Sequence, residues 1–149
     1  MTTRSVDEKR HWNLDRDLVG PRAPYFNHLW RVDAQACLVL EGQPDAVTAA
    51  QWEMPAVELA KCELDEKLLK TLEKHQTLYL AFDEDETGRE NTERFAARLG
   101  PLVRIVRWPE HDANDWLLAG ATGKDLQGLL KESPAWIDVL LDEARVEKD

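Results

Sequence analysis

The stretch LYLAFDEDETGRE, residues 78–90, runs from an apolar segment straight into four acidic residues and then meets a glycine. A short apolar run of this kind, ending here at Asp83, is typical of a buried strand. Residues 87–100 follow with the spacing of an amphipathic helix that ends at Gly100. A buried strand that ends in carboxylates and continues into a helix is the unit from which we predict the fold.

Strand and helix patterns alternate along the rest of the chain, joined by short links. Predicted strands cover residues 36–42, 55–60, 77–83 and 102–108, and the last has the partial alternation of an edge strand. Predicted helices cover residues 44–52, 64–75, 87–100, 109–120, 123–133 and 134–149. This order predicts an α/β protein with a Rossmann-like, four-stranded, mainly parallel sheet, helices on both faces and extra C-terminal helices.

Length and composition favour one compact domain, because 149 residues with 43% apolar content can bury a sizeable core. We expect an N-terminal arm over residues 1–35, the α/β domain over 36–120, and C-terminal helices packed on the same domain over 121–149. The chain has no secretory h-region and no apolar run of membrane-spanning length, and its two cysteines have no metal-ligand spacing. These features predict a cytoplasmic protein with no membrane partner.

Acidic residues gather where the predicted strands end. Parallel sheets bind ligands outside the carboxyl ends of their strands, so side chains that follow different strands meet at one rim. The residues expected there are Glu41, Asp83, Asp85, Asp112 and Asp115. Clustered carboxylates repel one another unless a cation is present, and hard oxygen ligands suit Mg²⁺ or Mn²⁺. One or two such ions at the rim would suit phosphoryl transfer.

Three motifs lie at these positions: VLEGQPDAVTA, LAFDEDETGRE and HDANDWL. They resemble motifs of the Toprim domain. The first resembles its Glu-Gly-x-x-Asp motif, the second its Asp-x-Asp-x-x-Gly motif, and the third the later Asp-rich motif of its primase-type members. The match covers roughly residues 36–120 in the right order, spacing and strand context. The resemblance is closest to the catalytic domain of bacterial and phage primases.

The resemblance implies Mg²⁺- or Mn²⁺-dependent nucleotidyl transfer on nucleic acid, in DNA replication or repair. It assigns catalytic roles to Glu41, Asp83 and Asp85, and metal binding to these three together with Asp45 and Asp112. Candidate contacts to phosphate or nucleic acid are Arg89, Arg94 and Lys61. The implied partners are single-stranded DNA or RNA, nucleotides, and a helicase, primase or repair protein.

Other functions remain open from the sequence. The same motifs suit a Toprim nuclease of the OLD or M5 type, and the net charge of −10 favours a non-catalytic module that binds a replication or repair protein. The segment DEDET also fits the nucleophile motif of HAD-type phosphatases, but residues 88–112 lack the lysine which that family needs. A full primase carries a zinc-binding and a basic subdomain ahead of Toprim, and we expect neither within the first 35 residues.

Overall fold

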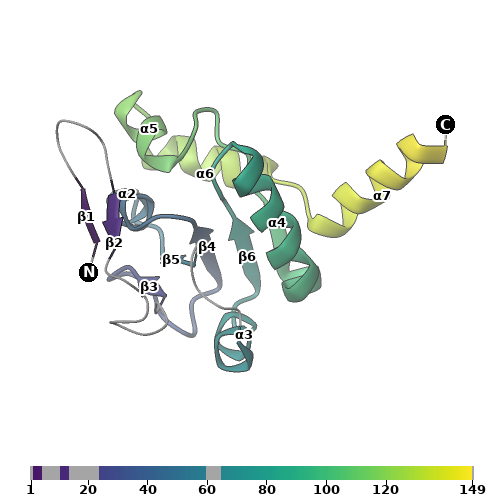
Figure 1. The fold of residues 1–149 in the computed structure, drawn as a ribbon, viewed down its shortest axis with the longest axis horizontal. Helices are drawn as coiled ribbons and strands as arrows, with labels where there is room; N and C mark the ends of the chain where they lie inside the picture. Colours follow the sequence, from purple (N-terminus) through teal and green to yellow (C-terminus); the bar gives the residue numbers. More distant parts are fainter. Residues whose placement is uncertain (1, 5–10, 14–23, 60–64, 149) are drawn as a thin grey trace.

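The structure, a computed structural model, describes residues 2–4, 11–13, 24–59 and 65–148. Its centre is a five-stranded sheet with the order β3-β5-β4-β6-β7. Figure 1 labels strands β3 to β6 of this sheet. The strands of this sheet are β3 (Tyr25–Phe26), β4 (Ala36–Leu40), β5 (Ala56–Glu58), β6 (Thr77–Leu80) and β7 (Val103–Ile105). A separate antiparallel pair joins β1 (Thr2–Arg4) to β2 (His11–Asn13).

The central sheet is mainly parallel, which confirms the predicted fold class. Strands β4 to β7 pair in parallel, whereas β3 runs antiparallel to β5. The sheet therefore has one strand more than the four predicted, and the extra strand comes from the segment expected to be an arm. The side chain of Asn27 fixes it, because the amide donates to the carbonyls of Ala46 and Met54 while its oxygen accepts from the backbone N–H of Ala56.

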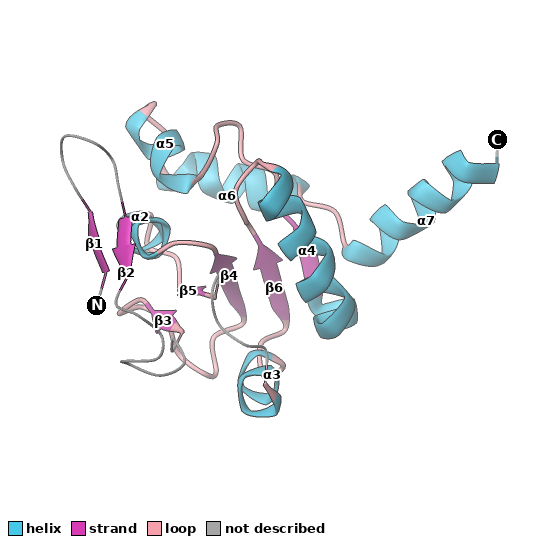
Figure 2. Ribbon diagram, viewed as in Figure 1, coloured by secondary structure: helices cyan, strands magenta, loops and turns pink. Residues whose placement is uncertain are grey.

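Helices follow the strands in the predicted order (Figure 2). They are α2 (Gln43–Gln51), α3 (Glu66–Leu72), α4 (Glu86–Leu99), α5 (Ala113–Leu118), α6 (Gly123–Glu132) and α7 (Trp136–Lys148). A 3₁₀ turn over Gly100–Leu102 separates α4 from β7. The predicted end of α4 is confirmed, because Gly100 has a φ of 62° and its N–H bonds to the carbonyl of Ala96.

Two hydrophobic cores cover the two faces of the sheet. Alternate residues of β4 supply them, with Cys37 and Val39 on one side and Leu38 and Leu40 on the other. The first core includes buried residues of α3 and α4, and the second includes buried residues of α2, α5 and α6. The predicted arrangement of helices on both faces is therefore confirmed.

Three tryptophans pack together in the second core. Trp52 and Trp108 are buried, and the ring of Trp116 lies 5.5 Å from the first and 5.8 Å from the second. The indole N–H of Trp108 donates to the carbonyl of Ala81, at the end of β6. These rings hold the loops after β6 and β7 in place, so their role here is packing.

The C-terminal segment closes the open edge of the sheet and then leaves it. β7 is the edge strand, as predicted, and the N–H of Ile105 donates to the carbonyl of Pro134. In α7, Trp136 and Val139 pack on the first core, whereas Leu140 is 39% exposed. The rest of α7 extends away from the sheet (Figure 1). No helix in the described part of the chain is long and apolar enough to cross a membrane.

Candidate functional site

Carboxylates from three strand ends meet at one rim of the sheet. Asp83 lies just after β6, Glu41 directly follows β4, and Asp112 lies between β7 and α5. Oxygen atoms of Asp83 and Asp112 and a ring nitrogen of His111 all lie within 4.8 Å of one another. The Oδ1 atom of Asp83 is buried and has no hydrogen-bond partner among the described residues. An acceptor left in this state is suited to a cation.

Two of the aspartates are held by the helices that they start. Asp85 is the N-cap of α4, and its Oδ1 accepts from the N–H of Gly88 at 2.7 Å. Asp112 is the N-cap of α5, and its Oδ1 accepts from the N–H of Asp115 at 2.7 Å. Each carboxylate thus uses one oxygen to satisfy a helix end and turns the other, Oδ2, toward His111.

His111 joins these two aspartates. Its Nε2 lies 3.3 Å from Oδ2 of Asp85, and its Nδ1 lies 3.4 Å from Oδ2 of Asp112. Its slight burial works against the charged ring, but the hydrogen bond to Asp112, the charges of Asp83 and Asp112 and the bond to Asp85 outweigh it. The pKa of His111 is therefore raised. His111 thus bridges the residues that start α4 and α5.

Asp45 sits deeper, in the first turn of α2, with a relative exposure of 6%. Its Oδ1 accepts from the N–H of Asn114 at 3.1 Å, which ties α2 to α5. The pKa of this carboxyl is raised to about 7. Burial is the largest cause and the charge of Asp112 the next, while the bond from Asn114 acts in the opposite direction.

The pKa of Asp83 is raised to about 8. Burial is the main cause, followed by the negative charges of Glu41 and Asp45, and the carboxyl of Glu41 also lies within hydrogen-bonding distance. Two neighbouring carboxyls with raised pKa values are unfavourable together in their ionised forms. A bound divalent cation would remove this cost, and so the site favours one.

Glu41 is oriented from α4. Its Oε1 accepts from the side-chain amide of Asn91 at 3.2 Å, and the oxygen of that amide accepts from Arg94 at 3.3 Å. The guanidinium of Arg94 also lies 5.0 Å from the ring centre of Phe95. Arg94, a predicted phosphate contact, is thus partly engaged in holding Asn91 and, through it, Glu41.

The four acidic residues at 83–86 have different surroundings. Asp83 faces the rim and Asp85 starts α4, whereas Glu84 accepts from the backbone N–H of Trp108 at 2.9 Å. The N–H of Glu84 also donates to the carbonyl of His111 at 2.8 Å. These two bonds tie the loop after β6 to the loop after β7, which keeps the two halves of the rim together. Glu86 is exposed.

Gly88 serves the rim through its lack of a side chain. It is a residue of α4 itself, and the glycines with positive φ in the described chain are Gly100 and Gly120. A Cβ atom at Gly88 would lie 1.9 Å from the carbonyl oxygen of Asp83. Glycine is required here so that α4 can start directly against the backbone of Asp83.

The remaining predicted residues lie at different distances from this cluster. Asp115 is exposed and adds to the negative charge around Asp45. Arg89 is exposed in the first turns of α4 and makes no ion pair with any other described residue. Lys61 lies outside the described residues. Neither His111 nor Asn91 is among the residues predicted from the sequence, although the position of His111 beside Asp112 was a usable signal.

The donor set fits a hard divalent cation. Carboxylate oxygens dominate it and His111 adds one nitrogen, a combination that suits Mg²⁺ or Mn²⁺ better than a thiophilic metal. Two further observations favour a bound cation. The Oδ1 of Asp83 has no hydrogen-bond partner among the described residues, and the pKa values of Asp83 and Asp45 are raised.

Comparisons with known proteins show which family and which folds this chain is similar to. Residues 38–117 match the family model described as Toprim-like. A structure of bacteriophage T7 lagging-strand DNA polymerase interacting with primase domains bound to an RNA/DNA hybrid and dTTP matches with 26% identity and a TM-score of 0.56. This match covers 73% of the present chain and 59% of the solved one. The primase fragment of the bacteriophage T7 primase-helicase protein matches with 26% identity and a TM-score of 0.55, covering 69% and 46%.

The Aquifex aeolicus primase, solved with its zinc-binding and RNA polymerase domains, shares the fold at 20% identity and a TM-score of 0.63, over 74% of this chain and 29% of that one. The present chain therefore covers less than two thirds of each of these solved chains. A search of curated protein sequences finds no match. Since the family model spans more than half of the sequence, from the strand before Glu41 to the helix after Asp112, this chain belongs to the Toprim-like family.

Proposed function

We propose that this protein is a primase-like, Mg²⁺- or Mn²⁺-dependent nucleotidyltransferase that acts on nucleic acid in DNA replication or repair, in the cytoplasm. Its Toprim-like family and its similarity to phage primase structures support a nucleic-acid-related role. The observation that carries the proposal is the grouping of Asp83, His111 and Asp112, with Glu41 close to Asp83. The buried Oδ1 of Asp83 has no hydrogen-bond partner among the residues that the structure describes.

In this proposal Asp83, Asp85 and Asp112 would hold the metal, and the buried carboxyl of Asp45 would support them. The bound ion supplies charge stabilisation to the reacting phosphate. Asn91 orients Glu41 toward Asp83, where the carboxylate takes up a proton from the attacking hydroxyl or binds metal. Arg89 projects from the first turns of α4, a position suited to a phosphate oxygen of the substrate.

The decisive experiment incubates a labelled single strand with the protein and Mn²⁺, with and without nucleoside triphosphates. Longer products that require triphosphates support nucleotidyl transfer, whereas shorter products would assign the chain to the Toprim nucleases. Strands that stay unchanged under both conditions would contradict catalysis and leave a binding module.

A matched control variant removes the same number of negative charges at a surface far from the rim in the sequence. Asp83→Asn with Asp85→Asn should abolish product formation. Asp138→Asn with Asp142→Asn, on the exposed surface of α7, removes the same two charges and should leave product formation unchanged. Equal losses in both variants would show that overall charge, and not the rim, is responsible.

A further inference from the structure

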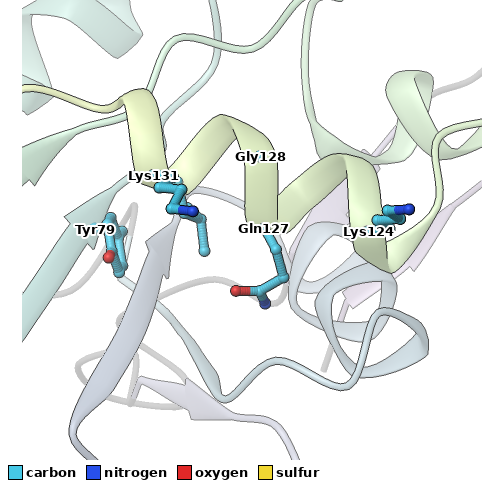
Figure 3. A pocket seen from close by; sticks show the side chains of 6 residues that line it. Tyr79, Lys124, Gln127, Gly128 and Lys131 are labelled. Atoms are coloured by element: carbon cyan, nitrogen blue, oxygen red, sulfur yellow. The ribbon is translucent and has the colours of Figure 1, made fainter.

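A second candidate site lies on α6, which follows the residues matched by the Toprim-like model. The structure has a pocket of about 490 Å³ there, a volume within the range of small-molecule sites. Its lining residues are Tyr79, Lys124, Gln127, Gly128, Leu130 and Lys131. Figure 3 shows Tyr79 and Lys131 at one end, Lys124 at the other, and Gln127 between them.

The spacing of the helical residues creates this pocket. Four lining residues share one face of α6, because Gln127, Gly128 and Lys131 lie three, four and seven residues after Lys124. The two lysines are separated by about 10.5 Å along the helix axis, at 1.5 Å per residue. Gly128 lies between them without a side chain, and a Cβ atom there would meet nothing within 4 Å. The space between the lysines is therefore open.

The chemistry of the lining is that of an anion site. The chain has a net charge of −10, yet no Asp or Glu among the described residues lines this pocket. In the described part of the chain neither Lys124 nor Lys131 makes an ion pair. Asp125, the acidic neighbour of Lys124, has its Oδ2 engaged by the N–H and hydroxyl of Thr122 in a capping box. Two ammonium groups and one amide are thus free to donate.

Tyr79 adds an aromatic surface beside these donors. It lies in β6 on the same side of the sheet as α6 and is half-buried. Aromatic side chains next to basic groups are the usual means of holding nucleotides, because the ring stacks on a base while the cations contact phosphate. A pocket with both features in an acidic protein points to a phosphorylated, base-containing ligand.

We propose that this pocket binds nucleotide units, with Lys124, Lys131 and Gln127 contacting phosphate oxygens and Tyr79 stacking on the base. The ligand is either a free nucleoside triphosphate or one segment of a single strand, since both present the same chemistry. The inference goes beyond the proposed function because it needs no metal. Tyr79 and Asp83 are four residues apart, so the pocket lies up to about 13 Å from the rim along the strand.

The test measures binding of a labelled oligothymidylate and, separately, of ATP to the intact protein in buffer with EDTA. Lys124→Gln with Lys131→Gln should weaken binding at least tenfold. For a strand, it should also reduce the slope of log affinity against log salt by about 1.4, at about 0.7 per lost phosphate contact. Gly128→Gln fills the pocket without changing charge and should weaken binding as well.

Lys67→Gln with Lys70→Gln is the matched control, because these exposed lysines lie on α3 and make the same charge change. Binding of the oligonucleotide alone would assign the pocket to a strand, and binding of ATP alone to a free nucleotide. No binding of either ligand by the wild type, or equal losses in the α3 control, would overturn the proposal. Mn²⁺ titration of the rim stays unchanged in all these variants, so failure here is distinguishable from failure of the proposed function.

Discussion

Replacing Gly88 by alanine tests whether the rim depends on the close approach of α4 to β6. The new Cβ would lie 1.9 Å from the carbonyl oxygen of Asp83 and 2.8 Å from its carbonyl carbon. Ordinary carbon–oxygen contacts are about 3.4 Å or longer, so the helix start and Asp83 must separate by about 1.5 Å. The contact is with backbone, which no side-chain rotation can relieve.

Two opposing effects set the size of the change. Alanine in a helix is favoured over glycine by up to about 1 kcal/mol, but forced overpacking costs about 1–3 kcal/mol or more. We expect Gly88→Ala to lower the free energy of unfolding by about 1–2 kcal/mol, which corresponds to about 2–4 °C in Tm per kcal/mol. Metal ligands must be held within about 0.5 Å, so Mn²⁺ affinity should fall at least tenfold.

Thermal denaturation and calorimetric titration with Mn²⁺ measure the two effects. Gly128→Ala is the matched control, because Gly128 lies within α6, is exposed, and its Cβ would meet nothing within 4 Å. We expect this control to gain up to about 1 kcal/mol in stability and to bind Mn²⁺ as the wild type does. A Gly88→Ala protein as stable as the control, with unchanged Mn²⁺ affinity, would refute the reasoning.

Three further changes probe the carboxylates. Asp83→Asn with Asp85→Asn should abolish Mn²⁺ binding in calorimetry. The Tm of the metal-free protein should stay the same or rise, because two like charges are removed while asparagine still caps α4. A large loss of Tm would instead assign the pair a structural role. The pKa of Asp45 is about 7 in the folded protein, against 3.8 in a free carboxyl, so the folded state holds this proton to a higher pH. The free energy of unfolding of the metal-free protein should therefore fall as pH rises from about 4 to about 7, by at most about 4 kcal/mol. Urea denaturation of Asp45→Asn should show a smaller fall, and an identical pH profile would contradict this assignment. Asn91→Ala should weaken Mn²⁺ binding several-fold with little change in Tm, whereas Asn91→Gln should restore part of it if the amide positions Glu41.

Local patterns in the sequence were sufficient for most of the fold. The apolar runs that became β4 and β6, the helix that ends at Gly100, and the order of strands and helices all depend on residues close together in the chain. The rim could also be expected, because the carboxyl ends of parallel strands necessarily meet. The roles assigned to Glu41, Asp83 and Asp85 remain predictions until metal binding and activity are measured.

Long-range contacts decided the rest. The two residues of β3 are too few to form a periodic pattern, and they become a strand only because β5 offers an unpaired edge and Asn27 anchors the turn. Likewise, the amide of Asn91 meets Glu41 across fifty residues. The function of a polar side chain depends on which distant groups surround it after packing, and hydrophobic periodicity carries no information about those partners.

The stretch at 83–86 shows both sources of information in one place. The sequence by itself determined that acidic residues leave the end of a buried strand, since periodicity places that strand. Only the tertiary structure decided that Asp83 faces the rim, Asp85 starts a helix and Glu84 holds the neighbouring loop. Gly88 follows the same rule, because the backbone atom that excludes a side chain there becomes its neighbour only when α4 packs against the end of β6.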